Sequence, residues 1–332
     1  MNFTDPQFYG GVIASIMLII GGFIGWILAR KNSKLAGIDI CYGISNIFPW
    51  VFASQVLSAG LAIFVFRYIN LFDTMQVAWV ATFVSIVGAP PSVMLLYGPG
   101  IKQLLTGSIL GGLLAAPVAT WLFNYITQPL GMPGVASNVF AMTITGVLIC
   151  GICKVLPWIK KREVIDHRKK TKPGEDVYSA KWLVRRCIAD FSEAQFWATE
   201  IASIFLFVGL IVEWMISTNL VAGGSGMIPA IVLSQFIGTG VGVFLYASKF
   251  DNGGWYGTYI PVVSVGPACV LMFGGGIHIA VIAGVLGGIL GPPLGEFLQS
   301  KCPDGIHPTN AYVAAMGICS TVVASTIRFL GF

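Results

Sequence analysis

Two Ser-Gln pairs lie inside apolar runs that are long enough to cross a lipid bilayer. Residues 49–60 read PWVFASQVLSAG and residues 229–240 read PAIVLSQFIGTG, with the proline, the Ser-Gln pair and a glycine in the same register. An amide side chain offers donors and an acceptor, and leaving it unpaired in hydrocarbon costs several kcal/mol. The candidate substrate-binding residues are therefore Ser54, Gln55, Ser234 and Gln235. The alternative is hydrogen bonding between helices, which contributes about 0.6 kcal/mol per contact on average.

Asn138 and Asn310 begin two further apolar runs, either as additional substrate-binding residues or as N-caps of the helices that follow. Glu296 lies within the ninth apolar run and is the candidate coupling carboxylate, with a carboxylate at the membrane surface as the alternative. The sequence contains no Gly-x-Ser-x-Gly, His-Glu-x-x-His or P-loop pattern. We therefore predict no enzymatic activity, no catalytic residue, no metal centre and no cofactor other than Na⁺, which carbonyl and hydroxyl oxygens would bind.

The composition indicates which class of element positions these side chains. Of the 332 residues, 56% are hydrophobic and 10% are charged, and the mean hydropathy is +0.82. Soluble domains carry roughly 25% charged residues. The apolar runs are about 20 residues long, which is the length of a membrane-spanning helix. The sequence therefore predicts an all-α polytopic membrane protein of about ten transmembrane helices, with a lipid membrane as its surroundings and no nucleic acid as a partner. The predicted spans are 10–29, 44–66, 77–97, 101–126, 138–159, 195–217, 227–247, 256–273, 277–299 and 309–330.

One polar segment, residues 160–194, separates the fifth and sixth spans and holds ten of the 19 lysine and arginine residues. The positive-inside rule makes this segment a cytoplasmic linker. Counting five spans in each direction then puts both termini outside the cytoplasm. We expect the chain to lie in a bacterial cytoplasmic membrane.

The Ser-Gln recurrence belongs to an internal repeat that covers most of the chain. The first half, 1–159, and the second half, 195–332, share blocks in the same order: 13–26 with 201–214, 77–101 with 253–277, 107–122 with 283–298, and Asn138 with Asn310. Each half holds five spans, and an odd number means that the two halves enter the membrane in opposite directions. The pattern predicts a 5+5 inverted-topology repeat, in which Gln55 would superpose on Gln235 and Trp79 on Trp255.

Glycine and proline recur at corresponding positions in the third, fourth, eighth and ninth spans. Such residues interrupt helices, and transporters of this kind bind their solutes where helices break near the midplane. The alternative is close helix packing through small residues. The predicted helix breaks are Pro91, Gly111, Gly112, Pro117, Pro267, Gly287, Gly288 and Pro293.

These features predict a secondary active transporter of a small polar or anionic solute, working by alternating access and coupled to Na⁺ or H⁺. An anion would bind backbone N–H groups at the helix breaks, where the helix dipole is positive. Two alternatives stay open: a passive channel or facilitator, and a membrane subunit of a multi-protein permease or enzyme complex. The expected partners are the small-molecule solute and a second copy of the chain in a homodimer.

Overall fold

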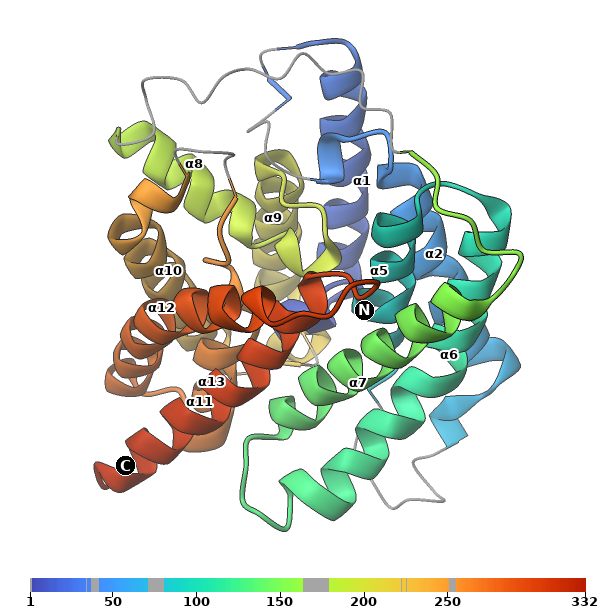
Figure 1. Cartoon of the computed structure of the whole chain (residues 1–332). Helices are drawn as coiled ribbons and strands as arrows, with labels where there is room; N and C mark the ends of the chain where they lie inside the picture. Colours follow the sequence, from blue (N-terminus) through green and yellow to red (C-terminus); the bar gives the residue numbers. More distant parts are fainter. Residues whose placement is uncertain are drawn as a thin grey trace.

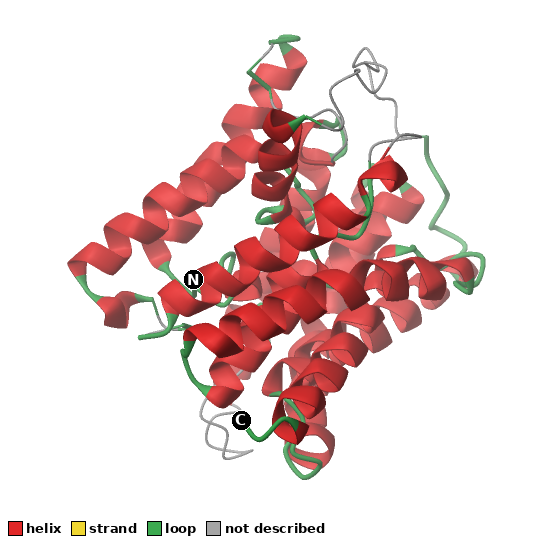
Figure 2. Cartoon of the chain, turned by 90° about the vertical axis from the view of Figure 1, so that its left-hand side faces the viewer, coloured by secondary structure: helices red, strands yellow, loops and turns green. Residues whose placement is uncertain are grey.

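The computed structural model describes residues 2–33, 35–36, 42–70, 81–163, 179–221, 223–224, 226–250 and 255–332. Every regular element in these ranges is helical (Figures 1 and 2). Seven helices are long and apolar enough to cross a membrane, which identifies the chain as an integral membrane protein. They are Val12–Arg30, Phe48–Val65, Ile101–Thr127, Gly134–Val155, Ile228–Leu245, Ile277–Ser300 and Thr309–Phe329.

The first half begins with a short 3₁₀ turn and holds four of the seven membrane-crossing helices. Its elements are η1 (Asp5–Gln7), α1 (Val12–Arg30), α2 (Phe48–Gly60), η3 (Leu61–Val65), α4 (Val84–Val87), α5 (Ala89–Tyr97), α6 (Ile101–Leu122), η5 (Phe123–Thr127) and α7 (Gly134–Val155). The π-helical turns η3 and η5 extend α2 and α6 without a gap in the chain.

The second half is preceded by a helix of its own, α8 (Ala180–Asp190), and by the 3₁₀ turn η6 (Glu193–Gln195). Ser179 caps α8, because its hydroxyl oxygen accepts a hydrogen bond from the Trp182 N–H at 3.1 Å. The remaining elements are α9 (Glu200–Ile216), α10 (Ile228–Leu245), the π-helical turn η9 (Pro261–Val265), α11 (Gly266–Phe273), α12 (Ile277–Ser300) and α13 (Thr309–Phe329). The C-terminal part of the predicted linker is therefore folded into the molecule.

Three of the ten predicted spans are not among these seven helices. The predicted span 195–217 is helical over Glu200–Ile216. The predicted span 77–97 is helical over Val84–Tyr97, and residues 71–80 and the Trp79 prediction lie outside the described ranges. The predicted span 256–273 is helical only over Pro261–Phe273. Helices of this length reach about 20 Å at 1.5 Å per residue, which is less than the hydrocarbon thickness of roughly 30 Å. These two segments are therefore partial helices packed inside the bundle.

The predicted breaks in the fourth and ninth spans are wrong. Helix α6 runs without interruption through Gly111, Gly112 and Pro117, and α12 runs through Gly287, Gly288 and Pro293. A proline inside a helix leaves the carbonyl four residues earlier without its N–H donor.

Tyrosine hydroxyl groups satisfy two of these carbonyls. The Tyr68 hydroxyl donates to the Leu113 carbonyl, four residues before Pro117, at 2.5 Å. The Tyr246 hydroxyl donates to the Ile289 carbonyl, four residues before Pro293, at 2.6 Å. Because these two stranded carbonyls have new donors from other parts of the chain, α6 and α12 continue past Pro117 and Pro293.

The glycine pairs in α6 and α12 let backbones approach closely, as the packing alternative predicted. A Cβ atom on Gly112 would lie 2.8 Å from the Ser58 carbonyl oxygen of α2. A Cβ atom on Gly288 would lie 2.5 Å from the Gly238 carbonyl oxygen of α10. A larger residue at either position would push the helices apart.

The structure places an interruption beside one of the two remaining predicted breaks. Gly88 has φ −109° and ψ −118° and separates α4 from α5, and Pro91 lies in the first turn of α5. Pro267 lies in the first turn of α11, which continues directly from the π-helical turn η9. The helix therefore changes its winding there without ending.

The two halves meet through two antiparallel helix pairs. In the pair α1 and α9, Gly21 lies against Ala202 and Gly209 lies against Ala14, so the two helices run in opposite directions. The Glu213 carboxylate, at the end of α9, accepts hydrogen bonds from the Val12 N–H at 2.7 Å and from the two next residues of α1. A carboxylate there stabilises the positive end of the helix dipole.

The pair α7 and α13 repeats this arrangement on another side of the bundle. Gly146 of α7 lies against Asn310 near the start of α13, and Gly317 of α13 lies against Phe140 nearer the start of α7. These helices also run antiparallel to each other. Figure 1 shows α7 and α13 side by side across the front of the molecule.

Candidate functional site

Two short loops, which we call the N-terminal loop (4–11) and the central loop (192–199), have the same internal hydrogen bonds. The Thr4 hydroxyl accepts from the Gly11 N–H at 3.0 Å and pairs with the Ser15 hydroxyl at 2.9 Å. The Ser192 hydroxyl accepts from the Thr199 N–H at 2.9 Å and from the Ser203 hydroxyl at 3.0 Å. Both loops turn back on a phenylalanine with positive φ, Phe8 at 69° and Phe196 at 65°. The chain therefore forms the same hydrogen-bonded loop twice, once ahead of α1 and once ahead of α9.

The two loops bind each other through a reciprocal pair of amides. The Gln7 amide nitrogen donates to the Gln195 side-chain oxygen at 2.7 Å, and the Gln195 nitrogen donates back to the Gln7 oxygen at 2.8 Å. Each nitrogen also donates to a backbone carbonyl, that of Phe191 for Gln7 and that of Phe3 for Gln195. Both glutamines are 0% exposed, so this hydrogen-bonded pair joins the two loops in the interior of the protein.

The predicted substrate-binding glutamines hold these loops in place. The Gln55 amide donates to the Gln195 carbonyl at 2.9 Å and accepts from the Trp197 indole at 3.2 Å. The Gln235 amide donates to the Gln7 carbonyl at 3.1 Å and accepts from the Tyr9 hydroxyl at 2.6 Å. The structure therefore gives both glutamines the role named in the alternative, hydrogen bonding between elements.

The serines beside them bond within their own helices. The Ser54 hydroxyl donates to the Val51 carbonyl, and the Ser234 hydroxyl donates to the Ile231 carbonyl, both at 2.7 Å. Neither serine and neither neighbouring glutamine lines the cavity described next.

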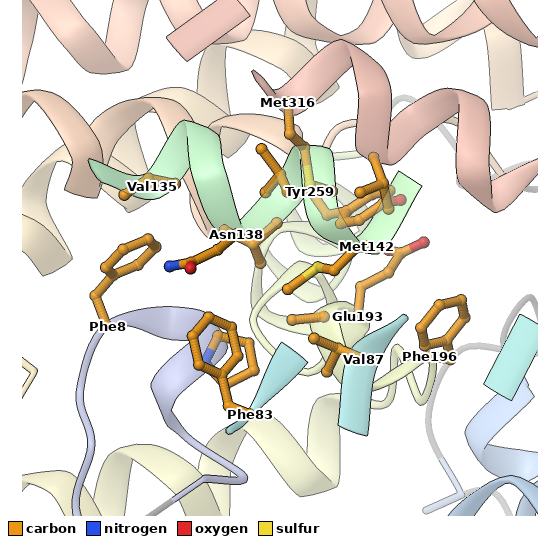
Figure 3. Close-up of a pocket in the computed structure, with 15 residues that line it drawn as sticks. Phe8, Phe83, Val87, Val135, Asn138, Met142, Glu193, Phe196, Tyr259 and Met316 are labelled. Carbon is orange, nitrogen blue, oxygen red and sulfur yellow. The ribbon is translucent and has the colours of Figure 1, made fainter. Parts of the chain in front are cut away.

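A cavity lies where the two loops meet helices of both halves (Figure 3). Its wall is mostly apolar, with four aromatic rings. The lining residues are Pro6, Phe8, Phe83, Val87, Val135, Asn138, Val139, Met142, Glu193, Ala194, Phe196, Tyr259, Val263, Val313 and Met316. Asn138 and Glu193 supply the polar side chains at which a solute would be oriented.

Asn138 is the predicted residue that the structure places in this wall. It is 6% exposed, and its amide has no hydrogen-bond partner among the described residues. Buried amides are normally paired, so this one is available to a ligand. It is not an N-cap, because α7 begins at Gly134.

Asn310 takes a different place. Its amide donates to the His307 carbonyl at 3.1 Å inside the first turn of α13, and it lies outside the cavity lining. Since α13 begins at Thr309, Asn310 is not an N-cap either.

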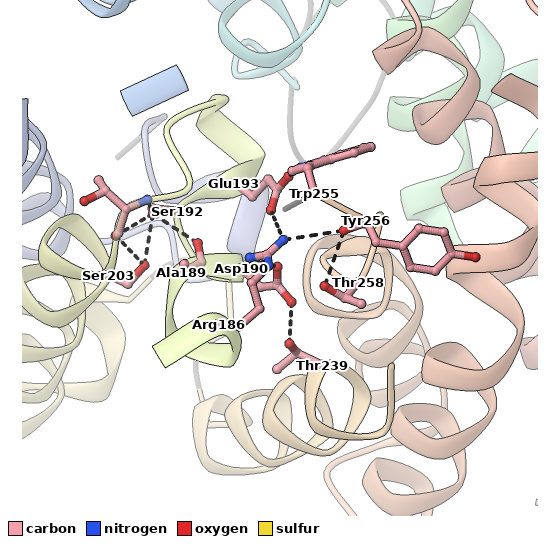
Figure 4. A network of polar contacts seen from close by, with 11 residues as sticks. Arg186, Ala189, Asp190, Ser192, Glu193, Ser203, Thr239, Trp255, Tyr256 and Thr258 are labelled. Carbon is pink, nitrogen blue, oxygen red and sulfur yellow. Dashed lines mark hydrogen bonds and ion pairs between the residues drawn. The ribbon is translucent and has the colours of Figure 1, made fainter. Parts of the chain in front are cut away.

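A buried ion cluster adjoins the cavity at Glu193 (Figure 4). Arg186 is 0% exposed and lies 2.7 Å from an Asp190 carboxylate oxygen and 3.1 Å from a Glu193 carboxylate oxygen. Thr239 donates a hydrogen bond to Asp190, and the Trp255 indole donates one to Glu193. One positive and two negative groups are thus enclosed together, and one of the negative groups faces the cavity.

Glu296, the predicted coupling carboxylate, lies away from this cluster. Its carboxylate accepts hydrogen bonds from the Lys249 ammonium at 2.7 Å and from the Tyr256 hydroxyl at 2.9 Å. Its side chain is 45% exposed, as the surface alternative describes.

Sequence reasoning missed the centre of the molecule for two reasons. The aligned blocks 13–26 and 201–214 extend backwards in the same register, so that Gln7-Phe8 matches Gln195-Phe196, but the match is short and polar. Arg186 was counted with the basic linker, although α8 buries it. Comparison with protein-family models, with curated proteins and with solved structures found no match to this chain.

Proposed function

We propose that this chain is a secondary active transporter with a 5+5 inverted-topology repeat, and that the cavity is its solute site. The observation that carries the proposal is the unpaired, buried Asn138 amide in a cavity that both halves line. The amide lies in the cavity wall, where a bound solute would serve as its hydrogen-bond partner.

The lining itself supports the repeat. Twelve of the lining residues fall into six pairs at corresponding positions of the two halves: Pro6 with Ala194, Phe8 with Phe196, Phe83 with Tyr259, Val87 with Val263, Val139 with Val313, and Met142 with Met316. The last two pairs use a register that differs by two residues from the predicted match of Asn138 with Asn310. The site would then lie on the axis that relates the halves.

The antiparallel pairs α1 with α9 and α7 with α13 support the same proposal. Corresponding helices of two inverted halves run in opposite directions where they meet, and both pairs do so. An inverted fold has two arrangements of similar energy, one open to each side of the membrane, which is the physical basis of alternating access. Coupling to H⁺ or Na⁺ is part of the proposal.

The cavity narrows the class of solute that we propose. Among the residues that the structure describes, its wall has no lysine, arginine or histidine, and an ionised Glu193 would repel an anion. We therefore favour a small solute with an apolar body and a hydrogen-bonding group that binds Asn138. An anionic solute would need the free backbone N–H groups of helix breaks, and α6 and α12 are unbroken.

An Asn138→Cys variant tests whether the cavity opens to both sides of the membrane. We expect a small, membrane-impermeant methanethiosulfonate to modify this cysteine both in sealed right-side-out vesicles and in sealed inside-out vesicles. Cysteine modification is measured by mass spectrometry. Asn310→Cys is the matched control and should stay unmodified, because Asn310 is buried outside the cavity.

Modification from one side only, or from neither side, would overturn alternating access at this cavity. Modification from both sides together with a steady ion current through the vesicle membrane would favour the channel alternative. No modification of Asn138→Cys alongside full modification of Asn310→Cys would place the solute path elsewhere.

A further inference from the structure

The charges around Glu193 do not balance. Arg186 contributes one positive charge, and Asp190 and Glu193 each contribute one negative charge, so the fully ionised cluster carries a net charge of −1. Arg186 and Asp190 are 0% exposed and Glu193 is 7% exposed. An uncompensated buried charge is very costly. The cluster therefore needs one more positive charge, either a proton or a cation.

The two carboxyl groups are arranged to hold that proton. Both carboxyl groups contact the guanidinium group of Arg186, Asp190 at 2.7 Å and Glu193 at 3.1 Å, and two like-charged carboxylates that share one buried site disfavour full ionisation of both. Burial raises the pKa of both groups, against the opposing effect of Arg186. The proton belongs to the pair, as in other closely coupled carboxyl groups.

Several other groups face Glu193 from the surrounding elements, and apart from Asp190 none of them changes its charge near physiological pH. They are Arg186 and Asp190 of α8, Tyr42 of the 3₁₀ turn η2 (Tyr42–Ile44), Trp255 and Tyr259 ahead of η9, and Tyr312 of α13. Arginine stays protonated and tyrosines, whose ordinary pKa is about 10, stay neutral at physiological pH. The shared proton is therefore the charge of the cluster that can change. Of the carboxyl pair, Glu193 is the member that lines the cavity.

We propose that Glu193 exchanges this proton for a small organic cation, so that the solute is a protonated amine with an apolar or aromatic body. The proposal rests on the proposed function, because it uses the same cavity. The proton leaves the Asp190–Glu193 pair for water, the ammonium group takes its place beside Glu193, and the net charge of the site is unchanged. The rings of Phe8, Phe83, Phe196 and Tyr259 suit a cation with an apolar body, because aromatic faces attract positive charge.

Three probes with one aromatic body and different charges test the proposal: 2-phenylethylamine, 2-phenylethanol and phenylacetate. Binding to the purified full chain is measured by titration calorimetry in buffers of different ionisation enthalpy, which reports the number of protons released. We expect the amine to bind at least tenfold more tightly than the alcohol and the acid, with release of up to one proton per amine. The alcohol and the acid should release none.

The pH dependence follows from competition between amine and proton. An alkylamine stays protonated to about pH 10, like lysine. The amine binds only the deprotonated pair, so its apparent affinity should rise by up to about tenfold per pH unit until the pH passes the raised pKa of the pair. Above that pKa, the affinity should level off.

Glu193→Gln should abolish proton release and weaken amine binding at least tenfold, while alcohol binding changes little. Glu296→Gln is the matched control. It should bind the amine and release protons as the unmodified chain does, because Glu296 lies in an exposed ion pair. The unmodified chain alone can overturn the proposal, which keeps it testable if Glu193→Gln fails to fold. Amine binding without proton release, or no preference for the amine, would do so. Either result combined with Asn138→Cys modification from both sides would leave the proposed function intact.

Discussion

Replacing Arg186 by methionine is expected to prevent most of the chain from folding. Methionine has a similar length but no charge, so Asp190 and Glu193 would be enclosed without a counter-ion. Removing one partner of a buried ion pair costs about 3–5 kcal/mol, which is a large part of the stability of an ordinary protein. The fraction of monodisperse protein after detergent extraction and its thermal midpoint measure this loss.

The adjacent residue provides the matched control. Arg185 pairs with Glu200 through two contacts, at 2.6 and 3.0 Å, but its side chain is 38% exposed. The Glu200 side chain is 10% exposed, but Arg185 itself reaches solvent, so Arg185→Met should lower the yield clearly less than Arg186→Met does. The triple variant Arg186→Met, Asp190→Asn, Glu193→Gln should recover much of the lost yield. Equal losses in the two single variants would contradict the account of the buried cluster.

Replacing either Gln7 or Gln195 by leucine is expected to give the second largest loss of stability. Each change leaves the other amide with an unpaired group in a buried place, at a cost of about 1–3 kcal/mol per stranded group. The double variant removes both amides and strands fewer groups than the two single variants together. Its loss should therefore be smaller than the sum of theirs, with a coupling of about 0.5–3 kcal/mol.

Thermal unfolding of the four proteins in one detergent measures this coupling. Gln299→Leu serves as the control, because Gln299 is exposed and the one hydrogen bond of its side chain within the described part of the chain is accepted from the Tyr312 hydroxyl. Surface changes of that kind usually fall within about 0.5 kcal/mol. Additive losses for Gln7 and Gln195 would show that the reciprocal pair does not hold the loops together.

The helical membrane class followed from composition, because 10% charged residues cannot cover a soluble surface. The helix breaks at Pro117 and Pro293 could not be decided locally. Whether a proline ends a helix depends on a donor for the stranded carbonyl, and here the donors are Tyr68 and Tyr246, about 50 residues earlier in the chain. A sequence window around the proline does not contain that information.

The same limit applies to the site. Gln55 and Gln235 were visible as amides at membrane depth, but their partners are the backbone carbonyls of Gln195 and Gln7, more than 100 residues away. The sequence predicts Asn138 and Asn310 as equivalent candidates, and it contains no feature that distinguishes one from the other. Their packing separates them, since Asn310 finds the His307 carbonyl within its own turn and Asn138 faces the cavity.

The orientation of the two halves in the membrane tests the central claim most directly. Lys102 and His278 are exposed and occupy corresponding positions, one residue after the starts of α6 and α12. The start of α6 lies beside the basic linker, because the Gln103 amide donates to the Lys160 carbonyl at 2.7 Å. We therefore expect Lys102 on the cytoplasmic side and His278 on the outer side.

Single cysteines at these two positions, in a chain whose seven native cysteines are replaced by alanine, make the measurement. A membrane-impermeant maleimide is added to sealed right-side-out vesicles, before and after permeabilisation. The account predicts that His278→Cys is labelled at once and Lys102→Cys only after permeabilisation. Labelling of both positions from the same side would contradict the inverted repeat, and with it the proposed mechanism of alternating access.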